Sequence, residues 1–271
     1  MFDNAPSKSD IERLERTHGT TLTCHVSRRE TIAVIEDYGL RWMRFSDGSI
    51  QSVMLLEDPA YPVLDYIQAL LCSFLFIDQP GSLLNLGLGS GSIERFILSR
   101  LPRIKLATVE IDPDLTELSR EYFHLPATHP VTQASAENFL SENRQTFDII
   151  VCDIYTKSVS DNPILTQGFI DDAARALNSD GVLALNCLPN TEAEMVDILL
   201  SIRTCFPWVM LLDVKAQKNI VAICAKRAFI SGSDLTSRME SLFQSTGLNL
   251  STICQQLIRL PVSPQYKRHD D

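Results

Sequence analysis

Short apolar runs alternate with longer amphipathic segments along most of the chain from residue 82 onward. The apolar runs have the length of buried strands, and each precedes a segment with apolar positions at helical spacing. The clearest runs lie at 83–88, 104–111, 147–154 and 181–188. Strands that are apolar on both faces are typical of a parallel sheet that helices cover on both sides. We therefore predict an α/β domain with a seven-stranded, mostly parallel sheet.

The last strands of this sheet do not follow the alternation. Apolar runs at 208–214 and 219–226 are separated by only a few residues, which is too short a connection for a helical crossover. We therefore expect them to form an antiparallel hairpin. Residues 232–260 have a helical pattern.

The region before residue 57 has a different pattern. It contains four β-rich runs that are separated by turn signals such as Gly39. The runs lie at 21–26, 31–37, 40–45 and 49–56. This pattern predicts a small antiparallel meander, so we expect a β-rich subdomain at 1–57 and the α/β domain at 58–271.

Composition and charge disfavour several classes of partner. The 271 residues carry a formal charge of −10, whereas binding to nucleic acid or to an anionic membrane needs a basic surface. The longest apolar segment is interrupted by polar residues and is too short to span a bilayer, and the N-terminus lacks the apolar core of a secretory signal. Seven cysteines without a CxxC pair and five histidines without ligand spacing predict no structural metal. We expect a soluble cytoplasmic protein.

A glycine turn follows the first predicted parallel strand. Gly87, Gly89 and Gly91 lie at its carboxyl end, where open α/β sheets bind ligands. Glycine permits positive φ and lets a ligand approach the backbone N–H groups at the start of the next helix. Glu110 ends the next strand, where a carboxylate accepts hydrogen bonds from ribose hydroxyls. Together these residues predict a nucleoside site, with a tight turn that binds no ligand as the alternative.

The spacing of the glycines favours one class of nucleoside. The turn reads GxGxG, and Ser92 stands where a dinucleotide-binding turn has its third glycine, so S-adenosylmethionine is preferred to a nicotinamide cofactor. Ser135 ends the third strand at the height of the base, although it also suits the N-cap of the next helix. Asp153 ends the fourth strand, where it is predicted to act as a general base or to bind an amine. A turn-forming Asp is the alternative for that position.

The order of four segments resembles the spermidine synthase group, the polyamine aminopropyltransferases within the S-adenosylmethionine-dependent methyltransferase fold. The segments read DGSIQS, DYIQALL, VEIDPDLTELSREYF and FDIIVCD, and the likeness covers roughly residues 40–190. The resemblance implies a Rossmann-like, methyltransferase-type sheet beside an N-terminal β subdomain. It also implies a small-molecule substrate, a nucleoside bound by Gln51, the glycine turn and Glu110, and often a homodimer.

The chain departs from this family where an amine would bind. The family has an Asp in the glycine turn that holds the ammonium group of decarboxylated S-adenosylmethionine, and the matching residue here is Ser90. Ile67 replaces the His of its YHE segment, and Ser135 replaces its adenine-side Asp. Of its DxxD pair only Asp153 remains, because Thr156 takes the second place. A polyamine cation in a cleft needs carboxylates to replace its hydration, so these changes argue against standard spermidine synthesis.

We predict a transferase of this group that uses S-adenosylmethionine or its decarboxylated form as donor. Its acceptor is unknown, and the neutral residues favour the intact donor and methyl or alkyl transfer. An aminopropyltransferase with a reorganised amine pocket and a non-catalytic nucleoside-binding protein are the alternatives. The predicted catalytic residues are Asp153, Tyr155 and Tyr66. The predicted donor contacts are Gln51, Gly87, Gly89, Ser90, Gly91, Glu110, Ile111, Ser135 and Ala136.

Overall fold

The structure is a computed structural model that describes residue 14 and residues 19–27, 29–154, 166–214 and 219–262. Its first sheet contains β1 (Thr20–Val26), β2 (Thr31–Asp37), β3 (Leu40–Phe45) and β4 (Ile50–Leu55) in chain order. All neighbouring strands are antiparallel, which confirms the predicted meander. Gly39 makes the turn between β2 and β3 with a φ of 78°, a value that suits glycine. The division of the chain into domains at residue 57 stays a prediction.

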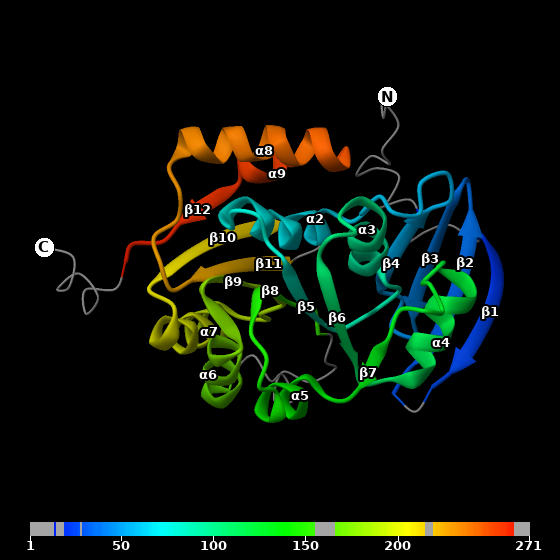
Figure 1. The fold of residues 1–271 in the computed structure, drawn as a ribbon. Helices are drawn as coiled ribbons and strands as arrows, with labels where there is room; N and C mark the ends of the chain where they lie inside the picture. Colours follow the sequence, from blue (N-terminus) through cyan, green and yellow to red (C-terminus); the bar gives the residue numbers. More distant parts are fainter. Residues whose placement is uncertain (1–13, 15–18, 28, 155–165, 215–218, 263–271) are drawn as a thin grey trace, which may run out of the picture.

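The second sheet follows the predicted alternation of strands and helices (Figure 1). Its strand order is β12-β10-β11-β9-β8-β5-β6-β7, and the five strands from β9 to β7 are parallel. β10 and β11 form the expected antiparallel hairpin pair. The strands are β5 (Ser82–Leu86), β6 (Lys105–Glu110), β7 (Val131–Gln133), β8 (Phe147–Cys152), β9 (Leu177–Cys187), β10 (Trp208–Val214), β11 (Asn219–Ala225) and β12 (Leu257–Arg259).

The prediction of seven strands is wrong, because the main sheet has eight. The additional strand is β12, which pairs antiparallel with β10 at the edge of the sheet. The sequence pattern predicts helix throughout 232–260, and the structure has α8 (Gly232–Thr246) and α9 (Ser251–Cys254) before this strand. Three residues are too few for a strand pattern to be recognised locally, and pairing with the open edge of β10 decides their conformation.

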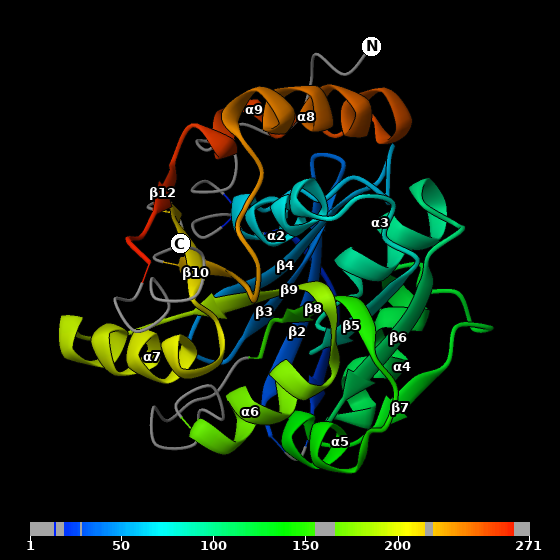
Figure 2. The ribbon, with the colours of Figure 1, turned by 60° about the vertical axis from the view of Figure 1, so that its left-hand side comes forward.

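Helices cover both faces of the main sheet (Figure 2). One face packs against α2 (Asp65–Leu71), the 3₁₀ helix η1 (Cys72–Phe76), α3 (Ser92–Arg100), α8 and α9. The other face packs against α5 (Ala136–Glu142), α6 (Gln167–Arg175) and α7 (Glu192–Cys205). Along β8, Ile149 and Val151 face the first group while Ile150 and Cys152 face the second. This alternation explains why the central strands are apolar at every position.

The N-terminal sheet packs on α4 (Pro113–Tyr122) with one face and joins the core around α2 and α3 with the other. α4 follows β6, and its Leu118 packs with Phe123 against an apolar face of the N-terminal sheet. The sheet contributes Ile32, Val34, Met43 and Met54 to this contact. Arg41 of β3 also donates a hydrogen bond to the Tyr122 carbonyl at the end of α4. These contacts hold the N-terminal sheet beside the carboxyl ends of the parallel strands.

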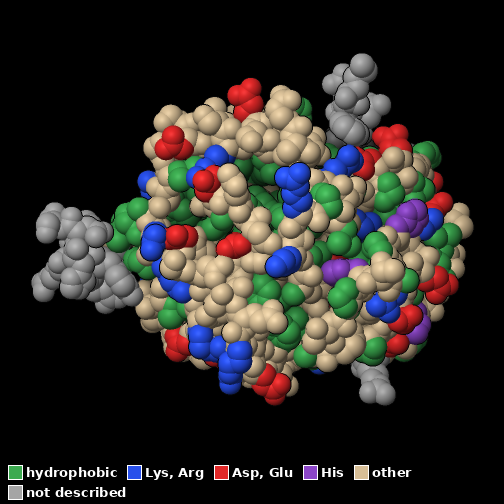
Figure 3. Space-filling model, viewed as in Figure 1, with side chains coloured by type: hydrophobic (Ala, Val, Ile, Leu, Met, Phe, Trp, Pro, Cys, Tyr) green, Lys and Arg blue, Asp and Glu red, His purple; other side chains and the backbone are tan. Residues whose placement is uncertain are grey.

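The described residues give no sign of a membrane span or a metal centre. None of the described helices combines the length and the apolar character that crossing a membrane requires. Across the same ranges, no cluster of three or more His, Cys, Asp or Glu side chains is arranged to hold a metal ion. Figure 3 shows acidic and basic side chains interspersed over one face of the molecule.

Candidate active site

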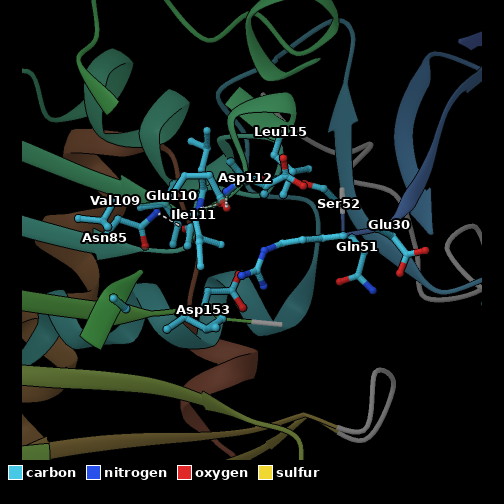
Figure 4. A pocket seen from close by; sticks show the side chains of 18 of the residues that line it. Glu30, Gln51, Ser52, Asn85, Val109, Glu110, Ile111, Asp112, Leu115 and Asp153 are labelled. Carbon is cyan, nitrogen blue, oxygen red and sulfur yellow. Dashed lines mark hydrogen bonds between the residues drawn. The ribbon is translucent and has the colours of Figure 1, made fainter. Parts of the chain in front are cut away.

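A cavity of about 500 Å³ lies at the carboxyl ends of the parallel strands. Its walls come from both sheets: the loops after β5, β6 and β8 form one side, and the N-terminal sheet forms the other. In Figure 4, Val109, Glu110 and Ile111 lie at one end, Gln51 and Glu30 at the opposite end, and Asp153 below the space between them. Of the predicted residues, the cavity lining includes Gln51, Tyr66, Gly87, Gly89, Glu110, Ile111, Ser135, Ala136 and Asp153.

The glycine turn is shaped by close contact between two strands. Gly87 has a φ of 97°, and its N–H donates to the Val109 carbonyl at 2.9 Å. A Cβ atom at this position would lie 2.1 Å from the carbonyl oxygen of Asp153, closer than atoms can approach. The turn therefore requires glycine here for the packing of β5 against β8 as well as for its backbone conformation.

Two of the predicted donor contacts do not line the cavity. The side chain of Ser90 is fully buried, and its hydroxyl forms a hydrogen bond with the hydroxyl of Ser52 on β4. Ser52 also lies 3.3 Å from the hydroxyl of Ser92. Gly91 is the N-cap of α3, with a φ of 79°, and is likewise absent from the cavity lining. Ser90 thus joins the turn to the N-terminal sheet, and its hydroxyl does not face the cavity.

Glu110 combines a cavity position with a structural role. Its Oε2 accepts a hydrogen bond from the Leu88 N–H at 2.9 Å, and its Oε1 accepts one from the Asp112 N–H at 2.8 Å. Burial raises the pKa of this carboxyl, while the backbone N–H groups oppose the rise. Asp112 caps α4 by accepting from the Asp114 N–H at 3.0 Å. The helix cap is therefore a different acid, and Glu110 remains at the cavity.

Asp153 lies at the end of β8 within a chain of polar groups. Its Oδ1 accepts a hydrogen bond from Asn186 Nδ2 at 2.7 Å, and Asn186 Oδ1 accepts one from Asn219 Nδ2 at 2.7 Å. The Tyr66 hydroxyl lies 3.2 Å from the Gln51 carbonyl and also forms a hydrogen bond with the Asp153 carboxylate. Burial raises the pKa of Asp153 to about 6, although Asn186 and Tyr66 lower it.

Of the remaining predicted residues, some line the cavity and others lie outside the described residues. Ser135 lines the cavity, and its hydroxyl also accepts from the Asn138 N–H at 3.2 Å as the N-cap of α5, so both alternatives apply to it. Ile111 and Ala136 contribute apolar surface at the same end of the cavity. Tyr155, a predicted catalytic residue, lies outside the described residues, as does Thr156.

Sequence reasoning missed several polar groups at the site. Arg29 and Glu30 line the cavity from the turn between β1 and β2, and nothing in the local pattern indicates that this turn reaches the strand ends. Asn186 and Asn219 lie at the ends of apolar strands in β9 and β11. A buried amide at a strand end is a signal that was available for these two, because buried polar groups need partners.

The central part of the chain matches a known protein family. A family model described as the methyltransferase small domain matches residues 60–207, more than half of the chain. The chain belongs to this family. The methyltransferase small-domain region contains the glycine turn, Glu110 and Asp153, whereas the N-terminal sheet with Gln51 lies outside it.

Individual relatives support the resemblance to spermidine synthases. This chain is 30% identical over 158 residues to a polyamine aminopropyltransferase of Chromobacterium violaceum, and the match covers 57% of it. The chain spans only 60% of the length of that relative. It is also 28% identical to an N-terminal histidine N-methyltransferase of Emericella nidulans, over 63% of this chain and 34% of the relative.

The fold agrees with that of a solved structure. A probable spermidine synthase from Corynebacterium glutamicum superposes with a TM-score of 0.72 at 18% identity. The superposition covers 89% of this chain and 90% of the other. The S-adenosylmethionine-dependent methyltransferase fold with an appended N-terminal sheet, as the resemblance implied, is therefore confirmed.

Proposed function

We propose that the protein is an S-adenosylmethionine-type transferase whose donor lies in the cavity and whose acceptor lies beside Asp153. The pairing of two carboxyl groups in one cavity carries this proposal. Glu110 and Asp153 both line the cavity, and the charge of Glu110 helps to raise the pKa of Asp153. A carboxylate that binds ribose and a second one that orients or deprotonates an acceptor are suited to group transfer from a sulfonium nucleoside.

The proposed step is a displacement at a carbon attached to the sulfonium sulfur. A lone pair on the acceptor atom forms the new bond to that carbon, and the carbon–sulfur bond breaks with its electron pair left on sulfur. A nitrogen acceptor loses one proton, and we assign Asp153 as the group that receives it. A pKa of about 6 leaves Asp153 mostly ionised at pH 7, so it is able to accept this proton.

Tyr66 and Asn186 act as positioning residues in this scheme. Each forms a hydrogen bond with the Asp153 carboxylate, and the two residues come from different elements, Tyr66 from α2 and Asn186 from β9. Hydrogen bonds from two elements restrict the rotation of the carboxylate and keep one oxygen directed at the acceptor. We also propose Tyr155 as a residue of the acceptor pocket.

The finer reaction that we propose is methyl or alkyl transfer from the intact donor. Ser90 provides no charge in the glycine turn, and its hydroxyl is occupied by Ser52. No carboxylate of the turn therefore holds the ammonium group of a decarboxylated donor. The likeness to an N-terminal histidine N-methyltransferase is consistent with this choice.

Polyamine aminopropyl transfer is the second candidate. Among the described residues, five carboxyl side chains line the cavity, namely Glu30, Glu110, Asp112, Glu137 and Asp153, and such a surface suits a polyamine cation. The likeness to a polyamine aminopropyltransferase points the same way. In both cases a homodimer stays a prediction that size-exclusion chromatography with light scattering would test.

Direct binding and product analysis test the proposal. Calorimetric titration would compare S-adenosylmethionine, decarboxylated S-adenosylmethionine and methylthioadenosine on the wild type, Glu110→Gln and Asp153→Asn. We expect Glu110→Gln to weaken all three ligands about 10-fold and Asp153→Asn to leave their affinities unchanged. Asp213→Asn, at an exposed position on β10, is the matched control and should behave as the wild type.

Turnover with amines and with peptides that have a free N-terminus would then identify the group transferred. Release of S-adenosylhomocysteine indicates methyl transfer, whereas release of methylthioadenosine indicates transfer of the propyl-based chain. Asp153→Asn should lower turnover at least 100-fold, as expected for loss of a general base. A wild-type protein that binds none of the three nucleosides contradicts the proposal, and an Asp153→Asn variant with full turnover contradicts the role of Asp153.

A further inference from the structure

The cavity has an uneven distribution of charge. Among the described residues, the lining contains five carboxyl side chains and one basic side chain, that of Arg29. An intact S-adenosylmethionine would bring one more carboxylate into this space. Because like charges in a sheltered cavity repel each other strongly, the carboxylate of the donor needs a cation beside it, and Arg29 is the basic residue in the lining that meets this need.

Arg29 and Glu30 are held in a defined turn between β1 and β2. The Ser27 hydroxyl accepts hydrogen bonds from the Arg29 N–H at 3.1 Å and the Glu30 N–H at 3.0 Å. The Ser27 N–H donates to the Glu30 carbonyl at 2.8 Å, which closes the turn. This arrangement brings a basic and an acidic residue, consecutive in the chain, to the lining of the cavity.

The two side chains differ in how much of their bonding capacity the protein uses. Glu30 Oε1 accepts from the Thr31 N–H at 2.9 Å and from the hydroxyl of Ser46, and the residue is 8% exposed. Arg29 is exposed, and no described residue forms a hydrogen bond or ion pair with its guanidinium group. A fixed carboxylate and a guanidinium with open donors, both at the lining of one cavity, match the two charges of an α-amino acid group.

The glycine turn directs a donor tail toward this end of the cavity. The hydrogen bond between Ser90 and Ser52 places β4 directly against the turn, so a chain that leaves the turn meets the N-terminal sheet. Glu110 and Ile111 lie at the end opposite Gln51 and Glu30 in Figure 4. A nucleoside at Glu110 would therefore extend its amino acid tail past Asp153 toward the N-terminal sheet.

We propose that Arg29 binds the carboxylate and Glu30 the ammonium group of the methionyl tail of intact S-adenosylmethionine. This assignment rests on the proposed function and adds the residues that select the form of the donor. It locates this selection in the N-terminal sheet, outside the region that matches the methyltransferase small domain. The ammonium partner that Ser90 cannot provide thus comes from a different element of the fold.

Three ligands distinguish the two contacts, because they differ in which charged groups of the tail they carry. S-adenosylmethionine has both charges, its decarboxylated form keeps only the ammonium group, and methylthioadenosine has neither. Calorimetric titration of Arg29→Gln should show about 10-fold weaker binding of S-adenosylmethionine and unchanged binding of the other two. Glu30→Gln should weaken both charged ligands about 10-fold and leave methylthioadenosine unchanged.

Arg44→Gln is the matched control, since Arg44 lies on β3 of the same sheet and does not line the cavity. It should bind all three ligands as the wild type does. Equal affinity of Arg29→Gln and wild type for S-adenosylmethionine would overturn the assignment of Arg29, and so would an equal loss for all three ligands. Wild-type binding distinguishes the two levels of failure. If the wild type binds none of the three nucleosides, the proposed function is wrong. If the wild type binds them and Arg29→Gln or Glu30→Gln does not show its expected pattern, only the charge contacts are wrong.

Discussion

Replacement of Gly87 by alanine tests how closely the two central strands pack at the cavity. An added Cβ would lie 2.1 Å from the Asp153 carbonyl oxygen and 2.8 Å from its carbonyl carbon. Real Cβ contacts essentially never fall under 3.0 Å, so the end of β8 must move away by at least about 0.9 Å. The movement would strain the hydrogen bond of 2.8 Å from the Asp153 N–H to the Leu86 carbonyl.

Two contributions set the expected loss of unfolding free energy for Gly87→Ala. A non-glycine residue at positive φ costs about 1–2 kcal/mol, and the φ of Gly87 is 97°. Overpacking in a well-filled interior costs about 1–3 kcal/mol more. The sum is about 2–5 kcal/mol. Gly39→Ala supplies the control, because Gly39 has a φ of 78° but no atom within 4 Å of its added Cβ, so only the first contribution applies.

Urea unfolding followed by circular dichroism would measure both variants against the wild type. The midpoint of Gly87→Ala should fall further than that of Gly39→Ala, with the slope unchanged if both remain two-state. Should Gly87→Ala fail to fold, Gly89→Ala provides a second comparison within the same turn. Gly89 has a φ of 55° and no atom within 4 Å of its added Cβ, so this variant should fold normally. Equal midpoints for Gly87→Ala and Gly39→Ala would refute the claim that the approach of β8 requires glycine.

Three further predictions concern buried polar groups. Burial raises the pKa of Glu94 from 4.5 to about 7, so the folded protein binds this proton more tightly, and its stability falls as pH rises from about 4.5 to 7. The wild type should lose up to about 3 kcal/mol of unfolding free energy between pH 4.5 and 7.5 through this group, and Glu94→Gln should not show this loss in urea unfolding. A Glu94→Gln variant with the pH dependence of the wild type would contradict this assignment. The acid limb of the pH profile of kcat/KM should lie near pH 6, the pKa of Asp153. Asn186→Ala should move this limb upward by about one pH unit, because Asn186 lowers the pKa of Asp153. A limb that does not move in this variant would exclude Asp153 as the group that titrates there. Tyr66→Phe should reduce kcat more than it changes the affinity for methylthioadenosine, whereas a loss confined to affinity would assign Tyr66 to donor binding.

The positions of Glu110 and Asp153 could be predicted from sequence because they follow a local rule. Each ends an apolar strand, and the carboxyl ends of parallel strands meet at one edge of a sheet. The direction of the Ser90 side chain does not follow such a rule. A matching position in the glycine turn suggested that it contacts the donor, yet its hydroxyl is buried in a hydrogen bond with Ser52 on β4, and Ser90 is absent from the cavity lining.

The sequence by itself determined the alternation of strands and helices, the glycine turn and the acids at the strand ends, since all of these depend on residues near each other in the chain. Tertiary structure alone decided that β12 joins the sheet, because an open edge on β10 accepts it. It also decided that Arg29 and Glu30 face the same cavity as Asp153. That meeting depends on the packing of the N-terminal sheet against α4 on one face and against α2 and α3 on the other, contacts between segments far apart in the sequence that no local periodicity records.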